Sequence, residues 1–246
     1  MTKRIQILFG LVISLIASPC NINAQHSSKG SLSIAFNHYV DSLPLNLDST
    51  IYKNNSGQTF TVTNFKYYIG DIHLKKAEGK EYVSSGYFLI NEEEEKSKKI
   101  ILNNIPPGEY TSVSFIVGVD SIHNCSGAQS GALDPANAMF WAWNSGYIFL
   151  KFEGKSSFSR SPGNIFEYHI GGYKSPANSI RTITLELEYP LLIEDNKTAD
   201  LSIKVNAAEI LKSPTDIDLT KMSSVTDTRN ASIIADNYKD MFTIQK

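Results

Sequence analysis

Hydrophobic and polar residues alternate along most of the chain, which is the period of an extended strand with one buried face. The alternation is clearest near the start, where Leu32, Ile34, Phe36 and His38 fall on one side of a strand. Clusters of Gly, Pro, Asn and Asp separate the later apolar runs. The pattern predicts further strands at residues 60–66, 69–75, 86–91, 99–102, 111–119, 146–152, 166–170, 180–189 and 201–205.

Short strands at turn-bounded intervals indicate an all-β fold rather than alternating strands and helices. We predict a β-sandwich of short, mainly antiparallel strands with one or two short C-terminal helices. Asn206 can cap the first helix, over residues 207–212, and Pro214 ends it. Apolar positions on one side predict a second helix at about residues 231–242. We expect the second helix to pack on the sandwich.

The composition bounds the size of the core and excludes one class of partner. With 246 residues, of which 41% are hydrophobic and 20% charged, the chain can bury the core of a larger all-β domain. A formal net charge of -2 provides no electrostatic surface for a nucleic-acid backbone. No linker or internal repeat divides the chain, so we predict a single domain over residues 25–246.

Residues 1–24 have the features of a signal peptide. Lys3 and Arg4 precede an apolar stretch at residues 5–17 that is too short to span a bilayer, and Ala24 is a small residue suited to signal peptidase. We expect cleavage after Ala24 and a periplasmic or secreted protein. No later stretch is apolar enough to serve as a transmembrane anchor.

Cys20 provides an alternative to simple cleavage, because acylation of this residue would make the protein a lipoprotein. A lipobox needs a leucine-like residue three positions before the cysteine and a small residue directly before it, whereas this chain has Ala17 and Pro19. Simple cleavage is therefore preferred. Whether the chain is cleaved after Ala24 or acylated at Cys20, Cys125 is the remaining unmodified thiol, so no intramolecular disulfide is expected.

The sequence contains no familiar catalytic motif. It has no nucleophile elbow, Walker loop, dinucleotide fingerprint, His-Glu-x-x-His or Cys-x-x-Cys. We therefore predict that the protein is not an enzyme.

Histidine and cysteine are the residues that could hold a metal. His38 ends a strand, where it is either a hydrogen-bonded edge residue or a ligand. His169 precedes two glycines that allow a ligand or another backbone to approach closely. His123 and Cys125 lie two residues apart and could share a soft metal, but two ligands make an incomplete site and a buried or unused thiol is the simpler alternative.

The two tryptophans of the chain, Trp141 and Trp143, point to the same side if their segment is extended. Three interpretations remain open on the residues alone. The pair could belong to an aromatic core, could stack on a sugar or another planar ligand, or could provide a redox-active indole beside a metal.

Several segments together resemble the MbnP-like family. The most specific is a Trp-x-Trp-x-x-Gly-Tyr core at residues 141–147. The resemblance covers roughly residues 31–190. Its other parts are Phe36-Asn37-His38, Phe65-Lys66-Tyr67-Tyr68-Ile69, Gly118-Val119-Asp120, Gly131-Ala132-Leu133-Asp134-Pro135 and Tyr168-His169-Ile170-Gly171-Gly172.

This resemblance implies a β-rich periplasmic copper-binding protein that works with a diheme cytochrome c peroxidase-like partner. In the founding member the partner oxidises a tryptophan to kynurenine near the copper. Trp141 and Trp143 match that motif, and Trp143 is the preferred candidate for modification. His38 and His169 match recurrent family histidines, so the resemblance names them as copper ligands. We expect the two to converge beside the tryptophan segment.

One departure from the family pattern concerns the copper site. Copper-binding members carry Asn-His after the Gly-Val strand, whereas this chain has Asn124-Cys125, with His123 on the other side of the asparagine. A thiolate at Cys125 would suit cuprous ion. The competing hypothesis is a cell-envelope module that binds a glycan or another ligand without metal.

Overall fold

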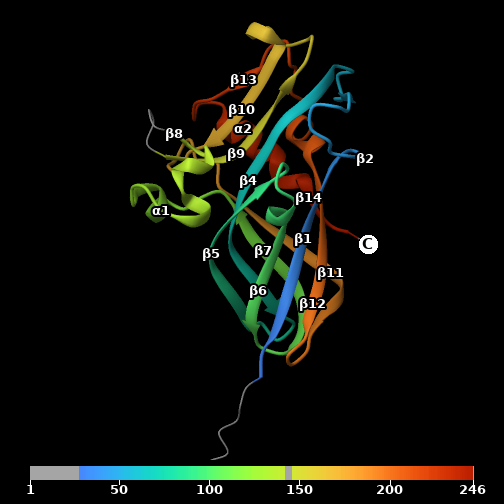
Figure 1. Ribbon diagram of the computed structural model, residues 1–246, viewed down its shortest axis with the longest axis vertical. Helices are drawn as coiled ribbons and strands as arrows, with labels where there is room; N and C mark the ends of the chain where they lie inside the picture. The colour runs from blue at the N-terminus through green and yellow to red at the C-terminus, as the bar shows by residue number, and fades with distance from the viewer. Residues whose placement is uncertain (1–27, 142–145, 246) are drawn as a thin grey trace, which may run out of the picture.

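The computed structural model describes residues 28–141 and 146–245, which form two β-sheets with short helices and turns around them (Figure 1). Within these residues the smaller sheet has five strands, in the order β14-β12-β1-β2 with β6 beside β1. They are β1 (Gly30–Val40), β2 (Leu43–Pro44), β6 (Lys99–Ile105), β12 (Thr198–Asn206) and β14 (Phe242–Ile244).

The larger sheet has nine strands in the described residues, in the order β11-β7-β4-β9-β10-β13, with β3 and β5 beside β4 and β8 beside β9. They are β3 (Tyr52–Lys53), β4 (Thr59–Lys76), β5 (Glu81–Asn91), β7 (Gly108–Val117), β8 (Phe140–Trp141), β9 (Gly146–Lys155), β10 (Ile165–Gly171), β11 (Arg181–Ile193) and β13 (Ser224–Val225). The long strand β4 pairs with β9 along its first part and with β7 along its last.

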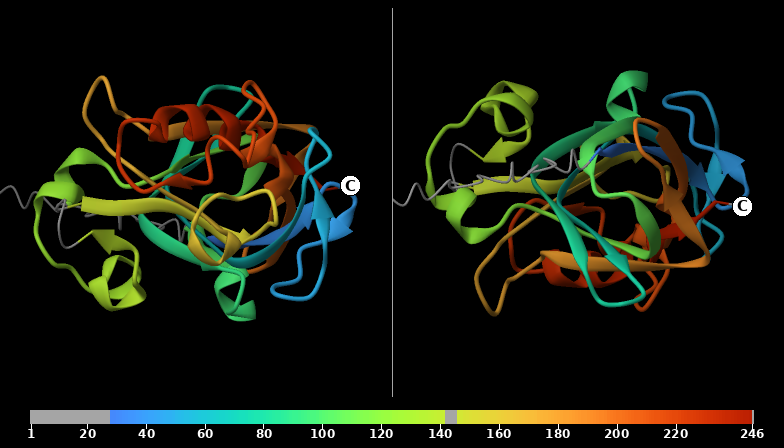
Figure 2. Two further views of the ribbon diagram at one scale, coloured as in Figure 1. Left: turned by 90° about the horizontal axis from the view of Figure 1, so that it is seen from above. Right: turned by 90° about the horizontal axis from the view of Figure 1, so that it is seen from below.

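The helical segments are short. They are the α-helices α1 (Ser121–Cys125) and α2 (Ala231–Tyr238), and the 3-10 turns η1 (Glu95–Lys98), η2 (Gly131–Leu133), η3 (Pro135–Asn137), η4 (Pro162–Asn164), η5 (Ala207–Leu211) and η6 (Lys239–Met241). α2 packs against β10 and η5, and Figure 2 shows it on one side of the molecule.

The prediction of an all-β sandwich of mainly antiparallel strands is confirmed, with one difference in detail. Helical structure is not confined to the C-terminal end, because the Asp120 side chain accepts a hydrogen bond from the backbone N–H of His123 and so caps α1 in the middle of the chain. Most strand pairs are antiparallel, although β1 pairs with β12 in parallel.

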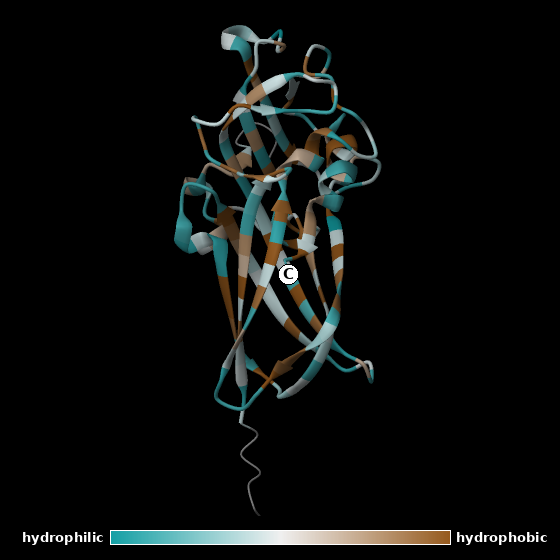
Figure 3. Cartoon of the chain, turned by 90° about the vertical axis from the view of Figure 1, so that its right-hand side faces the viewer, coloured by the Kyte–Doolittle hydropathy of each residue, from teal (hydrophilic) through white to brown (hydrophobic). Residues whose placement is uncertain are grey.

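The main core lies between the two sheets and is rich in aromatic rings. Phe36 and Phe242 of the smaller sheet meet Tyr67 and Phe115 of the larger sheet edge to face, at centroid distances of 5.1 to 6.4 Å. Figure 3 shows the resulting alternation of hydrophobic and hydrophilic residues along the strands. No helix in the described ranges is long and apolar enough to cross a membrane.

A second apolar cluster lies at one end of the larger sheet, beneath α1 and the turns that follow it. Figure 2 shows these segments on the opposite side of the molecule from β2 and β3. The cluster consists of Tyr68, Val119, Leu133, Met139, Trp141, Tyr147, Ile148 and Phe149. It covers the outer face of β4 and β9 at that end, so both faces of those strands are buried there.

Candidate functional site

His38 lies on β1 with its ring buried between the sheets. Nδ1 is 2.5 Å from Oε2 of Glu92, and Nε2 is 2.8 Å from the hydroxyl of Tyr67. Burial lowers the pKa of His38, although Glu92 acts in the opposite direction. A neutral ring that donates from Nδ1 to Glu92 and accepts from Tyr67 at Nε2 satisfies all three groups.

Glu92 is the partner of His38 that sequence patterns do not reveal. It begins a run of charged residues of the kind found at exposed turns, yet its side chain is only 10% exposed. Glu92 stays beside the larger sheet because its backbone N–H donates to the carbonyl of Phe65 on β4, which extends the pairing with β4 by one residue. Lys98 lies 3.4 Å from the same carboxylate.

His169 lies on β10 and faces the outer side of the larger sheet. Nε2 is 2.5 Å from Oε1 of Glu153, and the register places His169 opposite Lys151 of β9. The neighbouring residues Tyr168 and Ile170 point into the core between the sheets. The hydrogen bond from His169 lowers the pKa of the Glu153 carboxyl.

The expectation that His38 and His169 converge is not met. His38 contacts Phe65 and Tyr67 on the inner side of β4. Lys151, which is opposite His169, is also opposite Lys66, the residue of β4 that lies between those two and therefore points outward. The larger sheet thus separates the two imidazole rings. A role for either histidine as a copper ligand remains a prediction.

Trp141 is part of the second apolar cluster and is 5% exposed. Its ring packs on Gly171, where an added Cβ would lie 2.6 Å from Cζ3 of the tryptophan and 2.5 Å from the carbonyl of Tyr147. The close approach that the paired glycines allow is therefore made by this ring. The burial of Trp141 excludes it as an exposed stacking platform. Trp143 lies outside the described residues.

Asp120, His123 and Tyr87 form a polar group at the start of α1. Nδ1 of His123 is 2.6 Å from Oδ2 of Asp120, and the Tyr87 hydroxyl donates to the same carboxylate. Burial acts to raise the pKa of Asp120, but the hydrogen bonds from Tyr87 and His123 outweigh it and hold the pKa below its usual value. The sequence offers one signal for this group, the spacing of Asp120 from His123 as a helix cap.

Cys125 is exposed at the end of α1, and its Sγ is 3.2 Å from the hydroxyl of Tyr173. The preceding residue, Asn124, is buried and accepts a hydrogen bond from the backbone N–H of Tyr147. A hollow of about 260 Å³ adjoins these residues and is lined by Asn124, Trp141, Gly146, Gly172, Tyr173, Lys174 and Ala177. The structure therefore places Cys125, rather than His38, near the tryptophan segment.

Each of the four histidines in the described ranges faces a carboxylate, but the groups remain separate. They pair as His38 with Glu92, His73 with Glu81, His123 with Asp120 and His169 with Glu153. Across residues 28–141 and 146–245, no three His, Cys, Asp or Glu side chains lie together as a group that could hold a metal ion.

Comparisons with known proteins identify a relative of this scaffold. The sequence model of the MbnP family matches residues 29–230. No curated protein matches the chain. Among solved structures, MbnP from Methylosinus trichosporium superposes with a TM-score of 0.50 at 15% sequence identity, over 77% of this chain and 80% of that one. At this identity the structural likeness establishes a common fold.

Proposed function

The chain belongs to the MbnP family, and from this premise we propose that it is an exported copper-binding protein of the periplasm that is not itself an enzyme. The observation that carries the proposal is the match of the family model to nearly all of the described scaffold, from residue 29 to residue 230. The absence of recognisable catalytic motifs from the sequence supports the non-catalytic role.

The donors in the described residues do not fit a preassembled copper cage. His38 has both ring nitrogens engaged, by Glu92 and by Tyr67, so a metal would have to displace one of them. His169 lies on the opposite face of the sheet. Cys125 is the exposed soft donor near the tryptophan segment, but among the described residues it belongs to no group of three or more His, Cys, Asp or Glu side chains that could hold a metal ion.

Copper titration of the mature, metal-free protein tests the proposal directly. Cuprous and cupric ions would each be added in competition with a chromophoric chelator of known affinity. Binding of one equivalent supports the proposal, and failure to compete with the chelator for either ion rejects it. The Cys125→Ser and His169→Ala variants then identify the ligand by which of them loses copper. Neither side chain belongs to the main core, so both variants should fold.

We further propose that a diheme cytochrome c peroxidase-like partner oxidises a tryptophan of this protein to kynurenine, and that the residue is Trp143. The conversion breaks the C2–C3 bond of the indole ring, with dioxygen or two equivalents of peroxide as the oxidant, and water then removes C2 as formate. The ring therefore needs access from outside. The low exposure of Trp141, 5%, supports Trp143 by elimination within the motif. Peptide mass mapping after coexpression with a diheme peroxidase would locate the change, and a modification on Trp141 would contradict this assignment.

We propose export because residues 1–24 have the features of a signal peptide. These residues lie outside the described ranges. N-terminal sequencing of the protein recovered from the periplasm should begin at Gln25. A lipid-modified N-terminus at Cys20 would instead establish the lipoprotein alternative.

A further inference from the structure

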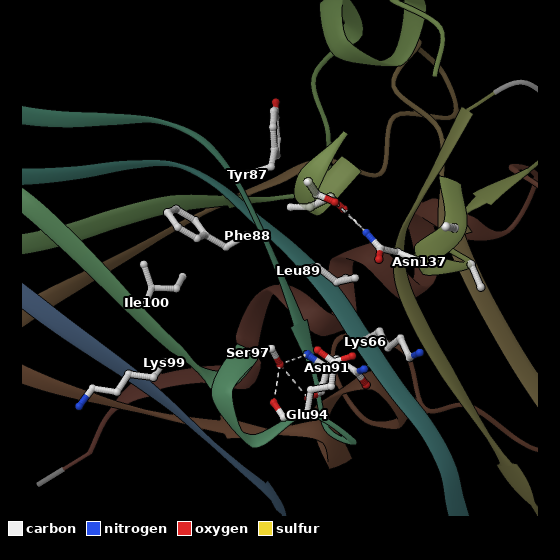
Figure 4. A pocket seen from close by; sticks show the side chains of 14 residues that line it. Lys66, Tyr87, Phe88, Leu89, Asn91, Glu94, Ser97, Lys99, Ile100 and Asn137 are labelled. Atoms are coloured by element: carbon white, nitrogen blue, oxygen red, sulfur yellow. Dashed lines mark hydrogen bonds between the residues drawn. The ribbon is translucent and has the colours of Figure 1, made fainter. Parts of the chain in front are cut away.

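A polar cleft of about 490 Å³ lies on the outer face of the larger sheet (Figure 4). Its floor is formed by Lys66 of β4 with Leu89 and Asn91 of β5, which the strand register places on one face. The turns η2 and η3, with the residues that flank them, form one wall, and η1 forms the opposite rim. A cleft of this volume matches a small-molecule ligand of about monosaccharide size.

Lys66 carries a positive charge that is only weakly neutralised. The side chain is 15% exposed, so its ammonium group is partly removed from water. In the described part of the chain the acid that faces it is Glu93, at 3.5 Å, and the Glu93 side chain is 57% exposed. An ion pair at this separation, with its carboxylate largely in solvent, contributes little.

A second lysine adds to the positive field on the same face. Lys151 of β9 stands directly opposite Lys66, and like charges at opposed positions of neighbouring strands repel each other. Lys151 donates from Nζ to the carbonyl of Ala138 at 2.7 Å, at the wall of the cleft. Burial lowers the pKa of Lys151; the charge of Glu153 opposes this shift, the charge of Lys66 adds to it to a smaller extent, and Glu167 acts to raise the pKa.

Among the other lining groups, Glu94 and Lys99 carry opposite charges near η1, and the amides suit a ligand with several hydroxyl groups. Asn137 donates from its side-chain nitrogen to the carbonyls of Gly131 and Ala132, at 3.0 and 2.9 Å, which fixes this amide on the wall. Figure 4 shows it across the cleft from Leu89 and Lys66. Amide groups on two sides and an apolar leucine between them can contact the edges and the face of a small ring.

We propose that this cleft binds a hydroxylated carboxylic acid of about monosaccharide size, with Lys66 as the residue that holds the carboxylate. The ligand carboxylate replaces the weak contact from Glu93 and offsets the repulsion between Lys66 and Lys151. Asn91, Asn137 and Leu89 contact the remainder of the ligand. None of His38, His169 and Cys125 lines this cleft, and the proposal does not depend on copper binding.

Calorimetric titration of the metal-free mature protein with D-glucuronate and with D-glucose tests the proposal, because the two probes share a ring and differ in charge. A charge-assisted hydrogen bond favours glucuronate by about tenfold or more. Lys66→Met keeps the apolar stem of the side chain and should abolish this preference. Lys155→Met removes an exposed lysine of β9 that does not line the cleft, and it should retain the preference.

A second variant tests the same site independently, in case Lys66→Met does not fold. Ala136 is exposed on the wall of the cleft, so Ala136→Asp adds a negative charge without disturbing the sheet. This variant should weaken glucuronate binding about tenfold or more and change glucose binding much less. Equal affinity of the wild type for the two probes, no binding of glucuronate, or an unchanged preference in folded variants at both positions would overturn the proposal.

Discussion

Replacing His38 with alanine should destabilise the protein through the two groups that the imidazole now satisfies. The ring lies in the core, with the Glu92 carboxylate at one nitrogen and the Tyr67 hydroxyl at the other. In His38→Ala the hydroxyl loses its acceptor and the carboxylate loses its shortest contact, while Lys98 remains 3.4 Å from Glu92. The variant thus tests whether His38 is chiefly a structural residue.

The expected loss follows from these contacts. A buried polar group left without a partner costs about 1–3 kcal/mol, and removal of the ring adds a cavity term. Because Lys98 still compensates part of the Glu92 charge, we expect a total loss of about 3 kcal/mol. Native domains are stable by only about 5–15 kcal/mol, so this is a large fraction of the free energy of unfolding.

Urea denaturation of the metal-free protein measures this loss. The midpoint should fall by about 1 M or more, given slopes of about 1–3 kcal/mol per molar urea. His73→Ala is the matched control, because His73 is partly exposed and pairs with Asp71 and Glu81 at 3.5 and 3.2 Å, contacts worth less than about 1 kcal/mol. A loss in His38→Ala no greater than that of the control would refute the reasoning, and reduced copper binding without destabilisation would make His38 a ligand.

Three further predictions concern pH, packing and the thiol. Burial lowers the pKa of His38 below its usual 6.5, so the imidazole binds a proton more readily in the unfolded chain than in the folded protein. The free energy of unfolding should therefore fall as pH drops through about 6.5. Urea melts should show a smaller pH-dependent fall in His38→Ala than in the wild type. Gly171→Ala should lower stability by about 2–3 kcal/mol in thermal melts, because its Cβ would overlap Trp141; an unchanged midpoint would contradict the packing. Cys125→Ser should alter stability by less than about 0.5 kcal/mol, and the wild-type thiol should react with an aromatic disulfide reagent without unfolding; a protected thiol would show that Cys125 is not exposed.

Sequence alternation was sufficient for the fold class and most strand positions, and it failed where both faces of a strand are covered. Tyr67 faces the main core and Tyr68 the second cluster, so the pattern loses its period in the middle of β4. The sequence therefore suggests two strands where one of 18 residues exists. The consecutive buried residues of β9 from Tyr147 to Leu150 have the same cause.

The candidate site was less predictable, because it depends on which layer each strand joins. The buried positions Phe166, Tyr168 and Ile170 already indicate that His169 faces away from the core. The alternation places His38 on the buried face of its strand, but no sequence pattern pairs it with Glu92, because the two residues are 54 positions apart and lie on different elements. The family motifs predict the scaffold, which the family model confirms, without specifying that their residues share a site.

The parallel pairing of β1 with β12 has a consequence for how the protein is made. Residues 31–39 of β1 pair with residues 198–206 of β12. The ribosome therefore synthesises β12 after β2 and β6, the other strands that pair with β1. Until then the emerging chain has an open strand edge and an incomplete core, and contacts between such distant segments form slowly. Completion of β12 is therefore the step that closes the smaller sheet around β1, and the partly folded chain has an exposed strand edge until that step.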